Sequence, residues 1–236
     1  MVEGSAANHT SSRKSRSDNP GPTSLDGAAI LAGIDPEFRH LIRRIDVLEE
    51  TDSTQDDILR MPSSERHGCV VLAERQSAGK GRRGRRWQSP AGNIFLSIGW
   101  HFVAPPRALD GLPLVVGVCL CRALARIDVK GHRVKRPNDI LIDGAKLCGI
   151  LVETRGGQSG RDTVTGIGLN VQLDDDSGDM IDQPWTDLQR LLGDGLPSRN
   201  EMVSTILEEL LPRYHDERRM SAFLADAWPE WDLSGG

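Results

Sequence analysis

Residues 133–152 read RVKRPNDILIDGAKLCGILV, in which three apolar segments are separated by two groups of turn residues. A Pro-Asn-Asp sequence at residues 137–139 separates the first two segments, and the Asp-Gly pair at 143–144 is typical of a two-residue β-hairpin. Because hairpins connect antiparallel neighbours, this stretch predicts three antiparallel strands. Hairpin-linked strands between a few helices predict an α+β fold with an antiparallel sheet and flanking helices, rather than a doubly wound sheet.

Apolar periodicity and turn residues divide the rest of the chain. We expect strands at residues 45–52, 69–74, 93–98 and 163–171. We expect helices that begin near Ser53, at Leu112 and after Ser198, the last of them interrupted at Pro212. Residues 174–182 are expected to be an acidic, mobile loop. Residues 1 to about 24 are rich in Ser, Asn, Gly and Pro, and residues 1–34 are expected to be a disordered leader before a single domain at 35–233.

Composition narrows the class of protein. The 236 residues are 38% hydrophobic and 27% charged, which is typical of a globular protein. The net charge of −5 argues against a general nucleic-acid binder, which needs a basic surface to hold phosphates. No apolar run reaches the ~18 residues of a membrane-spanning helix. The four cysteines lie in apolar sequence without metal-ligand spacing, so we expect reduced core thiols in a cytoplasmic protein that binds neither nucleic acid nor membrane.

The most informative stretch is the loop at residues 79–87, GKGRRGRRW, between two expected strands. Its glycines let the backbone approach an anion closely, and its guanidinium groups can close around the charge. Each such charge-assisted hydrogen bond contributes roughly 1.5–3 kcal/mol. Trp87 either stacks on a nucleobase, an interaction worth ~1–3 kcal/mol, or belongs to the core. The loop therefore predicts an anion-binding site, with a solvated charged loop as the alternative.

Two further explanations of this loop are weaker. A nuclear-localisation or nucleic-acid patch is typically a terminal or helical basic run, whereas these residues lie inside an acidic protein. A Walker A phosphate loop is excluded, because Glu74 occupies its first glycine position and Gly81 occupies its Ser/Thr position.

Lys146 and the turn before it also place polar groups beside apolar sequence. Lys146 precedes the apolar run at 147–152, so an inward-facing side chain would be a desolvated ammonium that needs an anionic partner. An outward-facing lysine on an amphipathic strand is the alternative. Lys135 and Asn138 flank Pro137, and this turn either presents an amide to a ligand or only ends a strand.

Five motifs, in the same order, resemble those of the biotin protein ligases. They cover most of the chain from about residue 45 to 231, and any one of them alone would be weak. They are DST at 52–54, AERQSAGKGRRGRRW at 73–87, KRPND at 135–139, KLCGILVE at 146–153 and GIGLNV at 166–171. The chain is therefore identified as a member of this family, in the monofunctional form without a DNA-binding domain.

The resemblance implies an ATP-dependent ligase. Biotin and Mg-ATP would form biotinyl-5′-AMP and pyrophosphate, and the mixed anhydride would then acylate one lysine of a biotin carboxyl carrier domain. The resemblance also implies a mixed, largely antiparallel sheet related to class II aminoacyl-tRNA synthetases, and no tightly bound prosthetic group. The carboxylase that is modified, the Mg²⁺ ligands and the formation of a homodimer, common among relatives, are left open.

The family's roles transfer to individual positions of this chain. Lys146 and Arg82 are the expected catalytic residues, because cations offset the repulsion when a carboxylate attacks a phosphate. The residues expected to bind biotin and the adenylate are Ser53, Thr54, Gln55, Gln76, Lys80, Gly81, Arg82 and Lys146. Those expected beside the adenine are Trp87, Lys135, Asn138 and Asn170. The loop is expected to close over the adenylate and shield the anhydride from water.

Several features depart from the family pattern. Gln55 replaces an asparagine, Lys80 replaces an arginine and so loses its bidentate fork, and Arg136 replaces a tryptophan. We expect the family's SH3-like C-terminal domain and an N-terminal winged-helix domain to be absent. The alternative functions are a lipoate or octanoate ligase of the same fold, whose family carries a different motif in place of the Gly-Arg loop, and a catalytically weakened biotin-binding protein.

Overall fold

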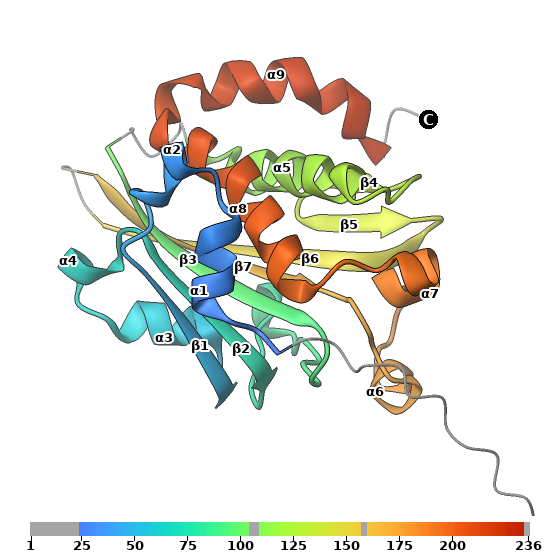
Figure 1. Cartoon of the computed structure of the whole chain (residues 1–236). Coiled ribbons are helices and arrows are strands. Elements are labelled where there is room, and N and C mark those ends of the chain that lie inside the picture. The colour runs from blue at the N-terminus through green and yellow to red at the C-terminus, as the bar shows by residue number, and fades with distance from the viewer. Residues whose placement is uncertain (1–23, 104–108, 157–159, 234–236) are drawn as a thin grey trace, which may run out of the picture.

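A seven-stranded sheet in the order β1-β2-β3-β7-β6-β5-β4 forms the centre of the structure, a computed structural model that describes residues 24–103, 109–156 and 160–233 (Figure 1). β1 and β2 are parallel, and the other neighbouring pairs are antiparallel. The predicted mixed, largely antiparallel sheet is thus confirmed. Its strands are β1 Arg44–Thr51, β2 Cys69–Gln76, β3 Ile94–Phe102, β4 Arg133–Lys135, β5 Asp139–Ile142, β6 Ala145–Arg155 and β7 Arg161–Leu169.

Residues 133–152 form three consecutive antiparallel strands, β4, β5 and β6, as predicted. Asp143 and Gly144 make the turn between β5 and β6, and both adopt positive φ angles of 48° and 80°. Such angles favour Asp and Gly, which explains why this dipeptide stands here. The hairpin brings the first residue of β5, Asp139, beside Lys146 of β6, and the two side chains form an ion pair.

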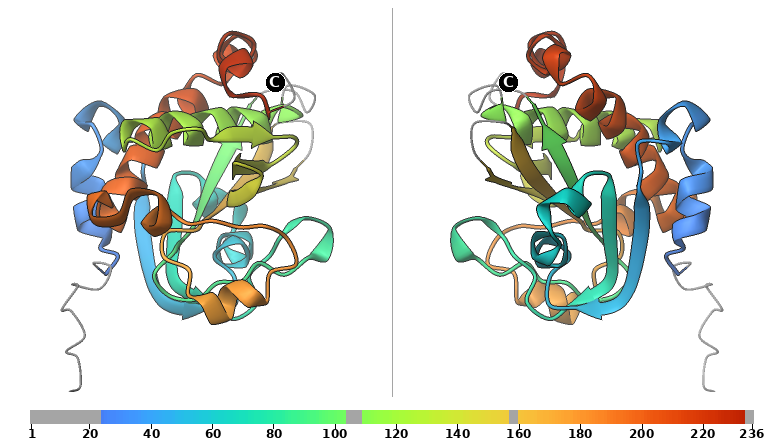
Figure 2. Two further views of the ribbon diagram at one scale, coloured as in Figure 1. Left: turned by 90° about the vertical axis from the view of Figure 1, so that its right-hand side faces the viewer. Right: turned by 90° about the vertical axis from the view of Figure 1, so that its left-hand side faces the viewer.

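Helices cover one face of the sheet, and α9 lies over α5 on the outside of this layer (Figures 1 and 2). The main apolar core lies between these helices and the sheet, and alternate residues of the strands point into it. On β7, for example, Ile167 and Leu169 belong to this core. The helices are α1 Gly27–Gly33, α5 Leu112–Arg126, α8 Arg199–His215 and α9 Met220–Trp231.

The opposite face of the sheet is only partly covered. The helix α3 Thr54–Arg60 packs there on a small apolar cluster that includes Ile58 and Val164. Beyond this cluster, β3, β6 and β7 carry small residues, Ser97, Gly149, Gly166 and Gly168, at the positions that alternate with core residues. These positions leave the surface of the sheet open next to α3. The short helices are α2 Pro36–Arg39, α4 Ser63–Arg66, α6 Asp175–Asp179 and α7 Leu188–Leu192.

The expected leader at residues 1–34 is wrong for its last part, and residues 1–23 lie outside the described residues. The side chain of Asp26 caps α1 by accepting hydrogen bonds from the amides of Ala28 and Ala29. Ile30 is fully buried, and the hydroxyl of Ser204 on α8 donates to its carbonyl at 2.8 Å. Contacts 174 residues apart in sequence therefore order this segment.

Two further expectations are wrong in detail. α8 continues through Pro212 to His215, because Leu211 and Tyr214 are buried on its inner side and compensate for the missing amide hydrogen bond. Part of residues 174–182, expected to be a mobile loop, forms α6, and the side chain of Asp174 caps it through the amide of Ser177.

The four cysteines are free and buried, as predicted. Among the described residues, no helix is long and apolar enough to cross a membrane.

Candidate active site

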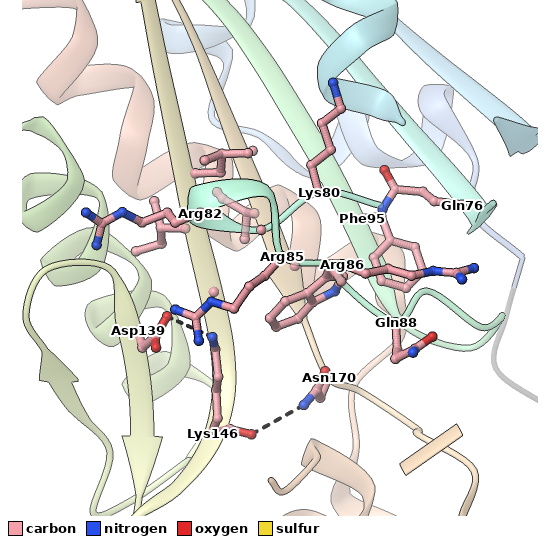
Figure 3. A pocket seen from close by; sticks show the side chains of 18 of the residues that line it. Gln76, Lys80, Arg82, Arg85, Arg86, Gln88, Phe95, Asp139, Lys146 and Asn170 are labelled. Carbon is pink, nitrogen blue, oxygen red and sulfur yellow. Dashed lines mark hydrogen bonds and ion pairs between the residues drawn. The ribbon is translucent and has the colours of Figure 1, made fainter. Parts of the chain in front are cut away.

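A cavity of about 340 Å³ lies on the partly covered face of the sheet, between the start of α3 and the Gly-Arg loop at residues 79–87. Figure 3 shows side chains from the loop, from β5 and from β6 that line it. Of the twelve residues predicted for the site, Lys135 alone does not line the cavity; it is exposed on the edge strand β4. The other eleven are Ser53, Thr54, Gln55, Gln76, Lys80, Gly81, Arg82, Trp87, Asn138, Lys146 and Asn170.

Glycines form the floor of the cavity under the indole of Trp87. Gly149 and Gly168 are directly paired across β6 and β7. A Cβ atom at Gly168 would lie 2.5 Å from Cε2 of Trp87, and one at Gly149 would lie 2.7 Å from Cζ3. Only glycine therefore permits the ring to lie so close to the sheet. The indole nitrogen of Trp87 is buried against this floor without a hydrogen-bond partner among the described residues.

A buried polar network forms the wall next to α3. The side-chain oxygen of Gln76 accepts from the amide of Thr54 at 2.9 Å, and the hydroxyls of Thr54 and Ser97 lie 2.8 Å apart. The amide nitrogen of Gln55 donates to the carbonyl of Val164 at 3.0 Å and to the carboxylate of Glu153 at 3.1 Å. These bonds fix the amides and hydroxyls at the cavity wall, so their remaining donors and acceptors are preorganised for a polar ligand.

Lys146 faces inward and has the anionic partner that its sequence context requires. Its Nζ lies 2.9 Å from Oδ1 of Asp139 and 5.1 Å from the centre of the Trp87 ring. The side chain of Lys146 is 13% exposed. A carboxylate and an aromatic face thus hold this ammonium at the cavity surface, where it can meet a second anion.

Hydrogen bonds within the Gly-Arg loop give it a defined shape. The amide of Gly81 donates to the carbonyl of Arg85 at 2.7 Å, and the amide of Trp87 donates to the carbonyl of Gly79 at 2.9 Å. Nη1 of Arg82 donates to Oδ1 of Asn138 at 3.1 Å, which connects the loop to the turn before β5. The side-chain amide of Asn138 in turn donates to the carbonyl of Ile150 at 2.8 Å. Arg82 therefore ties the loop to this turn, and in Figure 3 its side chain extends away from Lys146.

The remaining cations of the loop point in different directions. Nζ of Lys80 forms an ion pair with Asp56 on α3 at 2.6 Å, and Arg86 donates to the carbonyl of Ser77 at 3.1 Å. In Figure 3 both side chains extend away from Lys146, whereas the guanidinium of Arg85 is turned towards the Asp139–Lys146 pair. Sequence reasoning quoted Arg85 in a motif but assigned it no role. Its place in the cavity makes it a further anion-binding candidate.

The segment that follows α6 forms another part of the wall that the sequence did not predict. The amide of Lys146 donates to the carbonyl of Pro184 at 2.8 Å, which ties this segment to the start of β6. The side-chain amide of Asn170, a residue predicted to lie at the adenine edge, donates to the carbonyls of Lys146 and Thr186 at 3.3 and 3.0 Å. Asn170 thereby joins the two segments (Figure 3). The residues of this segment that line the cavity are Met180, Ile181, Asp182, Gln183 and Trp185.

Two titratable side chains of the motifs, Glu74 and Cys148, serve the fold and not the reaction. Burial alone would raise the pKa of Glu74, but hydrogen bonds from Arg199 and from the amide of Leu25 lower it. Glu74 therefore holds α8 and the chain before α1 to the sheet. Burial raises the pKa of Cys148 to about 12, so this thiol stays protonated and is no covalent nucleophile.

The comparisons with known proteins agree with this architecture, a mixed sheet whose open face carries a glycine floor and the Gly-Arg loop. A model of the "Biotin/lipoate A/B protein ligase family" matches residues 47–170, and the chain belongs to this family. The biotin--[acetyl-CoA-carboxylase] ligase of Mycobacterium tuberculosis is 34% identical over 195 residues, which cover 78% of this chain and 68% of that protein. The bifunctional ligase/repressor BirA of Escherichia coli is 37% identical over 167 residues, which cover 70% of this chain but only 51% of the relative. The chain thus spans about half the length of that relative.

Solved structures share the fold. The biotin protein ligase of Leishmania major, in complex with biotin, has a TM-score of 0.66 at 23% identity, covering 80% of this chain and 81% of that chain. The biotin protein ligase of Aquifex aeolicus, in complex with biotin and ATP, has a TM-score of 0.62 at 24% identity, covering 81% and 79%. At such identities the comparison establishes the fold of the catalytic unit.

Proposed function

We propose that this protein is a biotin–protein ligase that makes biotinyl-5′-AMP from biotin and ATP and transfers the biotin to a lysine of a biotin carboxyl carrier domain. The observation that carries the proposal is the convergence of Lys146, Arg82 and the indole of Trp87 on one cavity with a buried polar wall. Biotin presents a ureido ring at one end and a carboxylate at the other. A buried amide and hydroxyl wall suits the first, and cations suit the second.

In the proposed first step, a carboxylate oxygen of biotin attacks the α-phosphorus of ATP. The acyl–phosphate bond forms, the bond to the β-phosphate breaks and pyrophosphate leaves. Two anions approach each other, so cations placed between them lower the barrier. Lys146, held by Asp139, and Arg82, held by Asn138, supply these cations. Positioning of the two substrates supplies the rest of the acceleration, and no covalent enzyme intermediate is needed.

In the proposed second step, the neutral ε-amine of the acceptor lysine attacks the acyl carbon. An amide bond forms, the bond between the acyl carbon and the phosphate oxygen breaks, AMP leaves and the amine proton passes to solvent. Lys146 then stabilises the charge that develops during transfer, and the Gly-Arg loop keeps water away from the anhydride. The loop can do this because Arg82 closes it onto the turn before β5.

Magnesium enters such a reaction bound to ATP. Among the described residues, no group of three or more His, Cys, Asp or Glu side chains could hold a metal ion by itself. Asp139 and Asp182 are the carboxylates that line the cavity, and Mg²⁺ in nucleotide sites is held by phosphates with one or two carboxylates. Because Asp139 is paired with Lys146, Asp182 would be the carboxylate that meets the ion beside the phosphates, and the bound ion would neutralise phosphate charge.

The composition supports a proposed cellular compartment and a proposed class of partner. Four free, buried cysteines favour a reducing compartment, the cytoplasm. A net charge of −5 favours modification alone over binding to nucleic acid.

The direct test is incubation of the purified chain with ATP and Mg²⁺, with biotin and lipoate in parallel. We expect biotinyl-5′-AMP and pyrophosphate, detected by mass spectrometry and a pyrophosphate assay. A preference for lipoate, or biotin binding without an adenylate, would contradict the proposal. The first outcome would favour the lipoate ligase alternative and the second the weakened binding protein.

A further inference from the structure

Contacts between arginine guanidinium groups and aromatic rings attach α9 to the rest of the fold. Arg122 and Arg213 lie over the ring of Phe223, with their guanidinium carbons 4.9 and 4.3 Å from its centre. Near the other end of the helix, Arg136 lies over the ring of Trp228 at 4.6 Å. Figure 1 shows α9 extended along α5, with its C-terminal end towards β4.

The contact at Trp228 differs from the others because it leads to the cavity. Arg136 directly precedes the turn whose side chains hold both predicted catalytic cations. Asn138 accepts from Arg82 at 3.1 Å, and Asp139 pairs with Lys146 at 2.9 Å. Arg136 itself is exposed and does not line the cavity, so it does not act by touching a ligand there.

On its inner side this turn is held to β6 by two hydrogen bonds between Asn138 and Ile150, and on the side of the sheet edge it is supported by β4 and α9. β4 has only three residues and is the last strand of the sheet. Its outer side meets the end of α9 at a bridge between Val134 and Asp232, and His132, which precedes β4, stacks on Trp231 with the ring centres 5.0 Å apart. On its inner side, β4 pairs with β5 through three residue pairs. The position of the turn therefore depends on α9 as well as on β5.

We propose that Arg136 and Trp228 form a positioning pair, through which α9 holds Asn138 and Asp139 in place for the nucleotide. The ring of Trp228 restrains the Arg136 side chain, and this restrains the start of the turn. Loss of either member frees Asn138 and Asp139, and with them Arg82 and Lys146. The inference rests on the proposed function and adds a role for a residue that departs from the family pattern.

The test compares Arg136→Ala and Trp228→Ala with Arg122→Ala. The control removes a contact of the same chemistry on the same helix, where Arg213 still holds Phe223 and no residue of the turn is involved. KM values for ATP and biotin are measured in adenylate formation, since a smaller folded fraction changes neither. Hydrogen exchange of the peptide spanning residues 135–146 is measured in parallel and requires no activity.

We expect Arg136→Ala and Trp228→Ala to raise the KM for ATP at least fivefold and to raise the KM for biotin by a smaller factor. Both should accelerate exchange at residues 135–146, while Arg122→Ala should change neither quantity and Trp228→Phe should restore the KM for ATP. Unchanged KM and exchange in Arg136→Ala, or equal effects of Arg122→Ala, would overturn the inference. A wild type that forms no adenylate would refute the proposed function, and the exchange data alone would then decide whether α9 positions the turn.

Discussion

The ammonium of Lys146 and the carboxylate of Asp139 lie 2.9 Å apart at the surface of the cavity, where their side chains are 13% and 21% exposed. The bulged β5–β6 hairpin brings the two residues together. Because both groups are largely removed from water, the pair orients the ammonium more firmly than an exposed ion pair would. The ion pair therefore holds the Lys146 ammonium in place before a substrate anion binds, so binding does not have to order this side chain.

Removal of the Lys146 ammonium should reduce catalysis more than binding. We expect Lys146→Ala to lower kcat for adenylate formation about 10²–10³-fold, as for other preorganised charges aimed at a transition state. The dissociation constant for biotin, measured by calorimetry, should rise less. The matched control is Lys135→Ala, because Lys135 is exposed on β4 and outside the cavity. Equal losses in turnover and affinity would show that Lys146 only binds.

Asp139 should matter through Lys146. Asp139→Asn keeps the shape of the side chain but removes the negative charge next to a largely buried ammonium. We expect kcat to fall about tenfold, which corresponds to ~1.4 kcal/mol of transition-state stabilisation. Asp143→Asn is the control, since Asp143 is exposed in the adjacent turn and asparagine tolerates its positive φ. Steady-state kinetics that found the two variants alike would refute this role.

The glycine floor should tolerate no side chain. A methyl group at Gly168 would lie 2.5 Å from the Trp87 ring and displace it. We expect Gly168→Ala to weaken ATP binding about tenfold, or ~1.4 kcal/mol, and to lower stability by about 1–3 kcal/mol through overpacking. Gly195→Ala should change neither, because nothing lies within 4 Å of a Cβ atom there. Calorimetry and thermal unfolding measure both quantities, and a tight-binding Gly168→Ala variant would contradict the packing argument.

Acid should weaken the docking of α9 through His132. This residue is 2% exposed, its ring stacks on Trp231 at 5.0 Å, and its Nε2 lies 2.8 Å from the carbonyl of Cys121. Burial lowers the pKa of His132, against a smaller opposing effect of that hydrogen bond. The unfolded chain takes up the proton near pH 6.5, before the folded protein does. The free energy of unfolding should therefore fall as the pH drops below about 6.5 and towards the folded pKa.

Urea unfolding at pH 7.5 and 5.5 checks this sign. The wild type should lose more stability between the two values than His132→Gln, whereas the exposed-site variant His40→Gln should match the wild type. The pKa of His67 is also lowered, mainly by burial, but this residue is present in all three proteins and cancels in the comparison. Equal losses in the wild type and His132→Gln would contradict the assignment.

Local signals in the sequence predicted the sheet and most of the cavity. The Asp143-Gly144 turn specifies its hairpin because few other residue pairs adopt its angles. An inward-facing Lys146 was predicted to need an anionic partner, and the hairpin supplies Asp139, only seven positions away. Such structure can be predicted from the sequence because a turn and its hairpin depend only on residues that are close together in the chain.

Long-range packing could not be predicted in the same way. α1 is ordered by the hydroxyl of Ser204, far along the chain, so its short apolar sequence next to a polar segment did not predict a helix. Lys80 lines the cavity, yet its ammonium pairs with Asp56 on α3, a contact that no local pattern encodes. Gly149 and Gly168 were quoted in motifs without a role, because their function depends on an indole that only the tertiary fold brings to them.

The central claim is tested most directly by transfer to a protein acceptor. The purified chain, biotin, ATP and Mg²⁺ are mixed with an apo carrier domain, and the intact mass of the acceptor is followed over time with Lys146→Ala in parallel. The account predicts the addition of one biotinyl group at one lysine by the wild type, and a much slower addition by the variant. An unmodified acceptor with micromolar wild-type enzyme, or equal rates for the two proteins, would contradict it.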